Sequence, residues 1–135
     1  MIRIEDFVEW PVVEWNETST KEFLTGYDVR EALLRDSFPV KVLYNDTDPL
    51  CVCGLYRQSL VGYPCFWALF TRHFSDFSPS TLRVLRKIAK TWPSCYTYVE
   101  QGNAKAERLA RCFGFAPMEG AILIDDRLYS VYGRF

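Results

Sequence analysis

Seven stretches of the chain carry the apolar and polar pattern of β-strands. Residues 65–71, Cys-Phe-Trp-Ala-Leu-Phe-Thr, are apolar almost throughout, which predicts a central strand that is covered on both faces. Turn-forming residues at 45–49 and at 125–126 predict that the strands on either side of them form hairpins. The other predicted strands are residues 1–6, 39–44, 50–55, 95–100, 121–124 and 127–132.

Three stretches predict helices. In residues 103–113 the apolar side chains recur at i, i+3, i+4 and i+7, the spacing of one helix face, and Gly114 follows at the position where a left-handed residue ends a helix. Ser78 as N-cap and Pro79 at the first helical position predict a second helix over 79–91. A third helix is expected to begin at one of residues 18–20 and to run to about Asp36.

The order of these elements is β, α, β, β, β, α, β, α, β, β. The 135 residues are enough for one domain, and about half of them are apolar. We therefore predict a single α/β (α+β) domain that spans residues 1–135.

One segment resembles a known family. The pattern Asn103-x-x-Ala106-x-x-Leu109-x-x-x-x-Gly114-Phe115 looks like the C-terminal half of the GNAT family of N-acetyltransferases. In that family an Asn opens the helix after the fifth strand, and Gly-Phe closes it. The resemblance extends well over residues 40–132 and loosely over the first 40. Length and element order are most similar to the short, diverged acetyltransferase-like proteins of tailed bacteriophages, some of which act in virion assembly.

The resemblance implies a GNAT-like mixed twisted sheet with helices on both faces. It also implies a V-shaped cleft between strands 65–71 and 95–100 that holds acetyl-CoA. In the family, the strand before the cleft offers backbone groups to the pantetheine arm, and the next helix N-terminus binds the pyrophosphate. The cofactor-binding residues that this implies here are Ala68, Leu69, Phe70, Arg72, Ser78, Ser80 and Asn103.

The chain departs from the family in its phosphate loop. The family has a glycine-rich loop there, because glycine lets backbone N–H groups approach phosphate oxygens closely. Residues 72–77, Arg-His-Phe-Ser-Asp-Phe, contain no glycine, and Pro79 has no N–H to donate. This difference predicts that acetyl-CoA binds more weakly than about 100 μM, if it binds at all.

The acid–base groups also differ from the family. The family often places a Tyr one residue after the Leu of the Asn helix, where it protonates the departing thiolate, but Leu109 is followed here by Ala110. Tyr96 and Tyr98 could contribute hydroxyls from the strand beside the cleft. The candidates for a general base are Glu100, at the end of that strand, and His73.

Charge and cysteine content narrow the function further. The net charge of −1 and the lack of any 18-residue apolar run give no strong signal for nucleic acid and none for a membrane span. Five cysteines, mostly in strand-like runs, and a single His predict free thiols and no metal site. The N-terminus lacks the pattern of a signal peptide, so we expect a cytoplasmic protein, in the host cytoplasm or the virion if a phage encodes it.

Two features suggest a protein partner. The helix over 79–91 carries Arg83, Arg86, Lys87 and Lys90 on one face, which is either a solvated surface or a site for an acidic partner. The chain also has four Trp, eight Tyr and ten Phe. Of these, Trp10, Trp15 and Phe135 are candidates for exposed positions that mark an interface.

The sequence therefore leaves two hypotheses. The first is a diverged, phage-encoded binding protein that acts in virion assembly or host takeover, with weak or no acetyl-CoA use. The missing loop glycines and Ala110 favour it. The second is an active acetyl-CoA-dependent N-acetyltransferase of unknown amine acceptor. Asn103, the Gly114 stop and the helix start at Ser78 favour that alternative.

Overall fold

The structure is a computed structural model. It describes residues 2–11, 15, 30–58, 62–73, 78–124 and 126–135. The part of the predicted helix that falls within residues 16–29, and residues 74–77 of the phosphate loop, lie outside the described residues.

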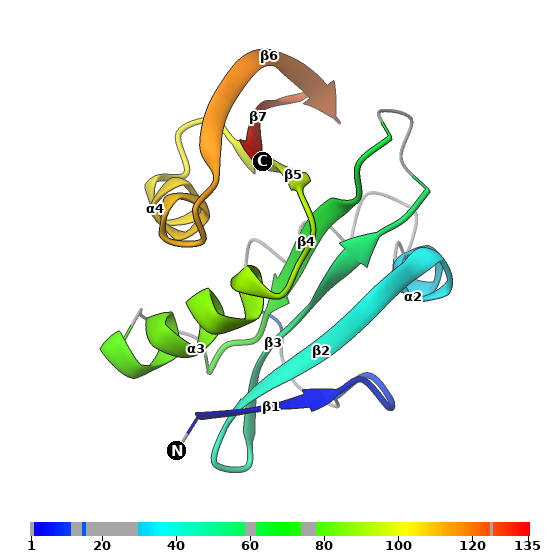
Figure 1. Ribbon diagram of the computed structural model, residues 1–135, viewed down its shortest axis with the longest axis vertical. Helices are drawn as coiled ribbons and strands as arrows, with labels where there is room; N and C mark the ends of the chain where they lie inside the picture. The colour runs from blue at the N-terminus through cyan, green and yellow to red at the C-terminus, as the bar shows by residue number, and fades with distance from the viewer. Residues whose placement is uncertain (1, 12–14, 16–29, 59–61, 74–77, 125) are drawn as a thin grey trace.

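The described strands form one mixed seven-stranded sheet in the order β1-β2-β3-β4-β5-β7-β6 (Figure 1). All its neighbouring strands are antiparallel except β4 and β5, which are parallel. The strands are β1 (Ile2–Asp6), β2 (Ser37–Asn45), β3 (Asp48–Tyr56), β4 (Cys65–Phe70), β5 (Cys95–Glu100), β6 (Ala116–Ile124) and β7 (Arg127–Arg134). The helices are α2 (Arg30–Asp36), α3 (Pro79–Lys90) and α4 (Ala104–Cys112).

Strand β4 lies in the middle of the sheet, as its apolar sequence predicted. It pairs with β3 along its whole length, from Cys65 opposite Tyr56 to Phe70 opposite Cys51. On its other side it pairs with β5 at a single position, Cys65 opposite Tyr96. The two parallel strands therefore meet at their N-terminal ends and diverge toward their C-terminal ends, which confirms the predicted V.

Helices α3 and α4 share one hydrophobic core with one face of the sheet. Phe66 is at its centre, with ring centroids 5.0 Å from Trp92, 5.6 Å from Phe113 and 5.8 Å from Phe115. Leu85 of α3 and Leu109 of α4 are buried in the same cluster. Trp92 follows α3, and Phe113 and Phe115 follow α4. Because the Phe66 ring packs against all three, the core fixes α3 and α4 relative to β4.

The opposite face of the sheet is also buried where β2, β3 and β4 run side by side. Val42, Val52 and Leu69 lie directly opposite one another across these strands and are at most 2% exposed. Trp67 is on the same face, where its Nε1 donates to Ser37 Oγ at 2.9 Å and its ring lies 6.3 Å from that of Trp10. Both faces of β4 are therefore covered.

The element order agrees with the prediction, and the differences are at the ends. Strand β2 begins at Ser37 and β6 at Ala116, both earlier than predicted. Leu85, Val99, Leu109 and Phe113 are buried, and the four cations of α3 are exposed. Phe135 is 65% exposed as expected. The expectation was wrong for Trp10 and Trp15, which are half-buried with their ring centroids 6.2 Å apart.

Candidate active site

The candidate site begins where β4 and β5 separate. Tyr96 N donates to Pro64 O at 3.2 Å, and Thr97 Oγ1 donates to Phe66 O at 2.9 Å, which closes the apex of the V. Phe66 O therefore points toward β5. Because backbone groups alternate along a strand, the N–H and C=O of Ala68 also point to that side, beyond the last residue with which β5 pairs.

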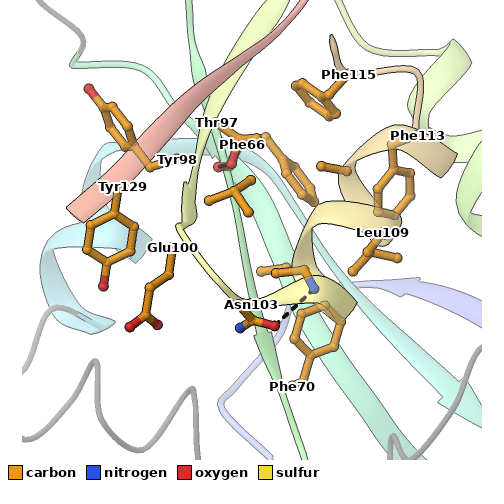
Figure 2. Close-up of a pocket in the computed structure, with 14 residues that line it drawn as sticks. Phe66, Phe70, Thr97, Tyr98, Glu100, Asn103, Leu109, Phe113, Phe115 and Tyr129 are labelled. Carbon is orange, nitrogen blue, oxygen red and sulfur yellow. Dashed lines mark hydrogen bonds between the residues drawn. The ribbon is translucent and has the colours of Figure 1, made fainter. Parts of the chain in front are cut away.

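A pocket of about 120 Å³ occupies the space between the diverging strands (Figure 2). Ala68 and Phe70 form its β4 wall, and Thr97 to Glu100 form its β5 wall. Helix α4 closes the third side with apolar residues of its inner face. These are Ala106, Leu109 and Ala110.

Asn103 links the pocket to the start of α4. Its Oδ1 accepts a hydrogen bond from Ala106 N at 3.1 Å, which is the N-cap interaction that the sequence predicted. At the other end of the helix Gly114 has φ +88°, Gly114 N donates to Arg111 O, and Phe115 N donates to Ala110 O. This is a Schellman motif, which holds Phe113 and Phe115 against the pocket.

Glu100 is the one carboxylate among the described residues that line the pocket. Its side chain is 33% exposed, and Arg127 Nε lies 4.0 Å from its Oε1. Tyr129 of β7 is directly opposite Glu100 in the sheet and also lines the pocket. Figure 2 shows the Tyr129 phenol and the Glu100 carboxylate on the same side of the pocket, with the hydroxyl of Tyr98 pointing away from them. An acid–base pair of this kind can accept and return a proton.

The cysteines do not supply a nucleophile to the pocket. All five are free, and none of them lines it. A hydrogen bond with Cys53 and burial both raise the pKa of the Cys51 thiol well above its usual value. Burial raises the pKa of Cys95, and it raises that of Cys65 to about 12. Thiols with such pKa values stay protonated at neutral pH and are poor nucleophiles.

The structure brings four of the sequence-predicted residues together. Ala68, Phe70, Glu100 and Asn103 all line the pocket. Leu69 does not, because its side chain lies on the opposite face of the sheet and is 1% exposed.

The remaining predicted site residues lie outside the pocket lining. Ser78 and Ser80 are exposed at the N-terminus of α3, where Ser78 Oγ accepts from Thr81 N at 3.2 Å. Arg72 and His73 are exposed after the end of β4, and His73 N donates to Thr71 Oγ1 at 3.2 Å. His73 is therefore not among the described residues that line the pocket with Glu100.

Sequence reasoning missed Tyr129 and Thr97. Tyr129 reaches the pocket through the register between β5 and β7, which places it opposite Glu100. No local signal at Tyr129 could have revealed this. Thr97 could have been found, because a Thr inside a buried strand needs a hydrogen-bond partner.

Two further findings concern the part of the chain that the structure describes. No group of three or more His, Cys, Asp or Glu side chains in these residues is arranged to hold a metal ion. No helix in them is long and apolar enough to cross a membrane.

No protein-family model matches the chain, and no curated protein matches its sequence. Solved structures do match. The crystal structure of a candidate phosphinothricin N-acetyltransferase has a TM-score of 0.72 and 13% identity, and the match covers 99% of this chain and 98% of that one. An acetyltransferase from Bacillus subtilis in complex with CoA has a TM-score of 0.67 and 8% identity, with 99% and 98% covered.

AAC(6')-Ib in complex with paromomycin and acetyl-CoA has a TM-score of 0.65 and 13% identity, with 98% of this chain and 92% of that one covered. None of these three descriptions names a phage protein, so the phage expectation stays untested. With a seven-stranded mixed sheet that opens between β4 and β5, and with these neighbours over nearly its whole length, the protein has the GNAT acetyltransferase fold.

Proposed function

We propose that the protein is an acetyl-CoA-dependent N-acetyltransferase that acts on an amine. The observation that carries the proposal is the pocket at the divergence of β4 and β5, with Glu100 at its edge and Ala68 on its β4 wall. The solved neighbours support it, since one is described with CoA bound and another with acetyl-CoA. The pocket gives this hypothesis more weight than the sequence did. A protein that had lost acetyl-CoA binding would not need to keep this cleft open.

The residues present fit the pantetheine end of acetyl-CoA better than its phosphates. Ala68 points its N–H and C=O toward the cleft, where an amide of the pantetheine arm could pair with them. In the first turn of α3, Thr81 N is bonded to Ser78 Oγ and Leu82 N to Ser78 O. Pro79 has no N–H, so Ser80 offers the remaining backbone donor of this turn among the described residues. We therefore expect acetyl-CoA to bind with modest affinity.

The chemistry would proceed by direct transfer. Acetyl-CoA supplies a thioester whose carbonyl carbon the acceptor amine attacks. The C–N bond forms, the C–S bond breaks, and the amine loses one proton. We assign that proton to Glu100, because it is the carboxylate of the pocket lining. The departing thiolate takes up a proton in turn, and Tyr129 lies on the same side of the pocket to supply it.

The test is the rate of acetyl transfer by the Glu100→Gln variant. We would measure CoA release from acetyl-CoA with benzylamine, putrescine and a tetrapeptide with a free N-terminus as acceptors. Glu100→Gln keeps the shape of the side chain and removes the base, so we expect kcat with the best acceptor to fall about 100-fold or more at pH 7. The KM for acetyl-CoA should change less than about twofold, because the proposal places Glu100 beside the acceptor amine and not beside acetyl-CoA.

Glu119→Gln is the matched control. Glu119 is exposed on β6 and is not part of the pocket lining, so its variant should keep the wild-type rate. Equal loss in both variants would contradict the assignment of Glu100. Failure to bind acetyl-CoA saturably, together with no transfer to any of the three amines, would contradict the proposed enzyme and favour the binding protein that the loop sequence suggests.

A further inference from the structure

A second hollow lies on the sheet side of α3, away from the candidate active site. It has a volume of about 550 Å³ and lies between the C-terminal half of α3 and the strands β1 and β2. Figure 1 shows α3 beside these strands, and none of the residues that line this groove also lines the candidate active site. We call it the α3 groove, and define it by the cations Lys41, Arg57 and Lys87 and the apolar residues Ile4, Phe38 and Ile88.

The charge of the α3 groove is positive. Lys41 forms an ion pair with Asp6, which is 81% exposed and does not line the groove. Arg57 Nε donates to Phe38 O at 2.7 Å, which leaves the guanidinium charge without a carboxylate partner among the described residues. Lys87 has no ion-pair partner in the described part of the chain. The groove therefore carries more positive charge than the described acidic side chains around it neutralise.

Helix α3 reinforces this positive charge. It carries four exposed cations between Pro79 and Lys90 and no acidic residue. Its C-terminal carbonyls would oppose an anion, but Ile88 O accepts from Thr91 N and Ala89 O accepts from Trp92 N. Of these four cations Lys87 lines the groove, whereas Arg86 Nε donates to Cys112 O at 3.3 Å.

The groove is also apolar. Phe38 is 74% exposed, and Ile4 and Ile88 are half-buried beside it. Two of the groove cations, Arg57 and Lys87, lack a carboxylate partner among the described residues. A groove that combines such cations with exposed apolar side chains fits a polypeptide that carries acidic and large apolar residues together. Nucleic acid fits less well, because a phosphate backbone would gain nothing from the aliphatic part of the groove and the net charge of the protein is negative.

We propose that the α3 groove docks an acidic, aromatic-containing segment of a partner protein. Acidic side chains pair with Lys87 and Arg57, and an apolar side chain of the partner packs on Phe38. The proposal does not depend on the candidate active site, because the two sites share no residue.

Fluorescence anisotropy with a labelled peptide, EDFEELDEFE, tests this proposal. We expect a Kd of about 10–100 μM at low salt, weakening as salt is added. Lys87→Glu should weaken binding at least tenfold, since it reverses a charge that contacts the peptide. Phe38→Ala should weaken it about fivefold or more, and should not affect a poly-Glu peptide of equal length. Both side chains are exposed, so these variants should fold.

Lys105→Glu is the matched control, because Lys105 is exposed on α4 outside both sites. It should change the Kd less than twofold. A peptide Kd above about 1 mM would overturn the proposal, and so would equal weakening by Lys105→Glu. Binding of a single-stranded DNA oligonucleotide as tight as that of the peptide, with the same loss in Lys87→Glu, would assign the groove to nucleic acid instead.

Discussion

At the scale of single residues, the proposed acetyl transfer depends on the position of Glu100. It is the last residue of β5, where pairing with β4 has already ended, and it is held opposite Tyr129 by pairing with β7. Its carboxylate is partly exposed at the pocket edge. A carboxylate fixed by backbone pairing on one side, with open space on the other, can meet a substrate without rearrangement of the strand.

The buried thiols provide a prediction about pH. The thiols of Cys51, Cys65 and Cys95 have raised pKa values in the folded protein. The unfolded chain therefore loses these protons first as the pH rises. The usual pKa of a Cys thiol is about 9, and that of Cys65 in the folded protein is about 12. The contribution of the thiols to stability is therefore complete below about pH 9 and is lost as the pH rises from 9 toward 12. The free energy of unfolding should fall over this interval.

Urea unfolding between pH 7 and pH 10, in the presence of reductant, measures this effect. Replacing one of the thiols should flatten the pH dependence by up to about 1.4 kcal/mol per pH unit above pH 9. Cys65→Ala is the variant of choice, because Cys65 is half-buried and its loss leaves a small cavity. The same slope in Cys65→Ala and wild type would show that Cys65 ionises equally in the folded and unfolded chain.

At the scale of elements, α4 was predictable because its signals are local. Asn103, the apolar spacing and Gly114 each act within one or two turns, and the structure has the N-cap and the Schellman motif that they predict. The start of α3 at Ser78 and Pro79 was predictable for the same reason. The hairpin of β6 and β7 was predicted, but the pairing of β7 with β5, which places Tyr129 opposite Glu100, was not, because no local signal in β7 names its second neighbour.

The N-cap of α4 gives a prediction of stability. Asn103→Ala removes the oxygen that accepts from Ala106 N, so the free energy of unfolding should fall by about 1 kcal/mol. Asn103→Asp keeps an acceptor at the same position and should remain within about 0.5 kcal/mol of wild type. Urea denaturation of the three proteins measures the difference. If Asn103→Asp lost as much as Asn103→Ala, the role of the side chain would not be that of a cap.

At the scale of the whole molecule, the separation of β4 and β5 creates the candidate site. The sequence of Cys65–Phe70 indicates a buried central strand. No residue in it indicates that the parallel strand β5 separates from it after one paired position. The sequence supplied this feature only through its resemblance to a family. In the structure the pocket takes up the space that continued pairing would have occupied, and Phe66 and the inner residues of α4 line it.

The central claim is that this pocket holds the acetyl end of acetyl-CoA. Calorimetric titration of acetyl-CoA into wild type and Ala106→Phe tests it most directly. Ala106 is half-buried and lines the pocket, so a phenyl group there fills it, whereas Ala104→Phe adds the same group at an exposed position two residues away.

The loop sequence predicts binding weaker than about 100 μM, whereas the proposed enzyme requires tighter binding. We predict for the enzyme one acetyl-CoA per wild-type chain with a Kd below about 100 μM, the same in Ala104→Phe, and at least tenfold weaker in Ala106→Phe with an unchanged melting temperature. Binding weaker than about 100 μM in wild type, or equal in all three proteins, would contradict the account.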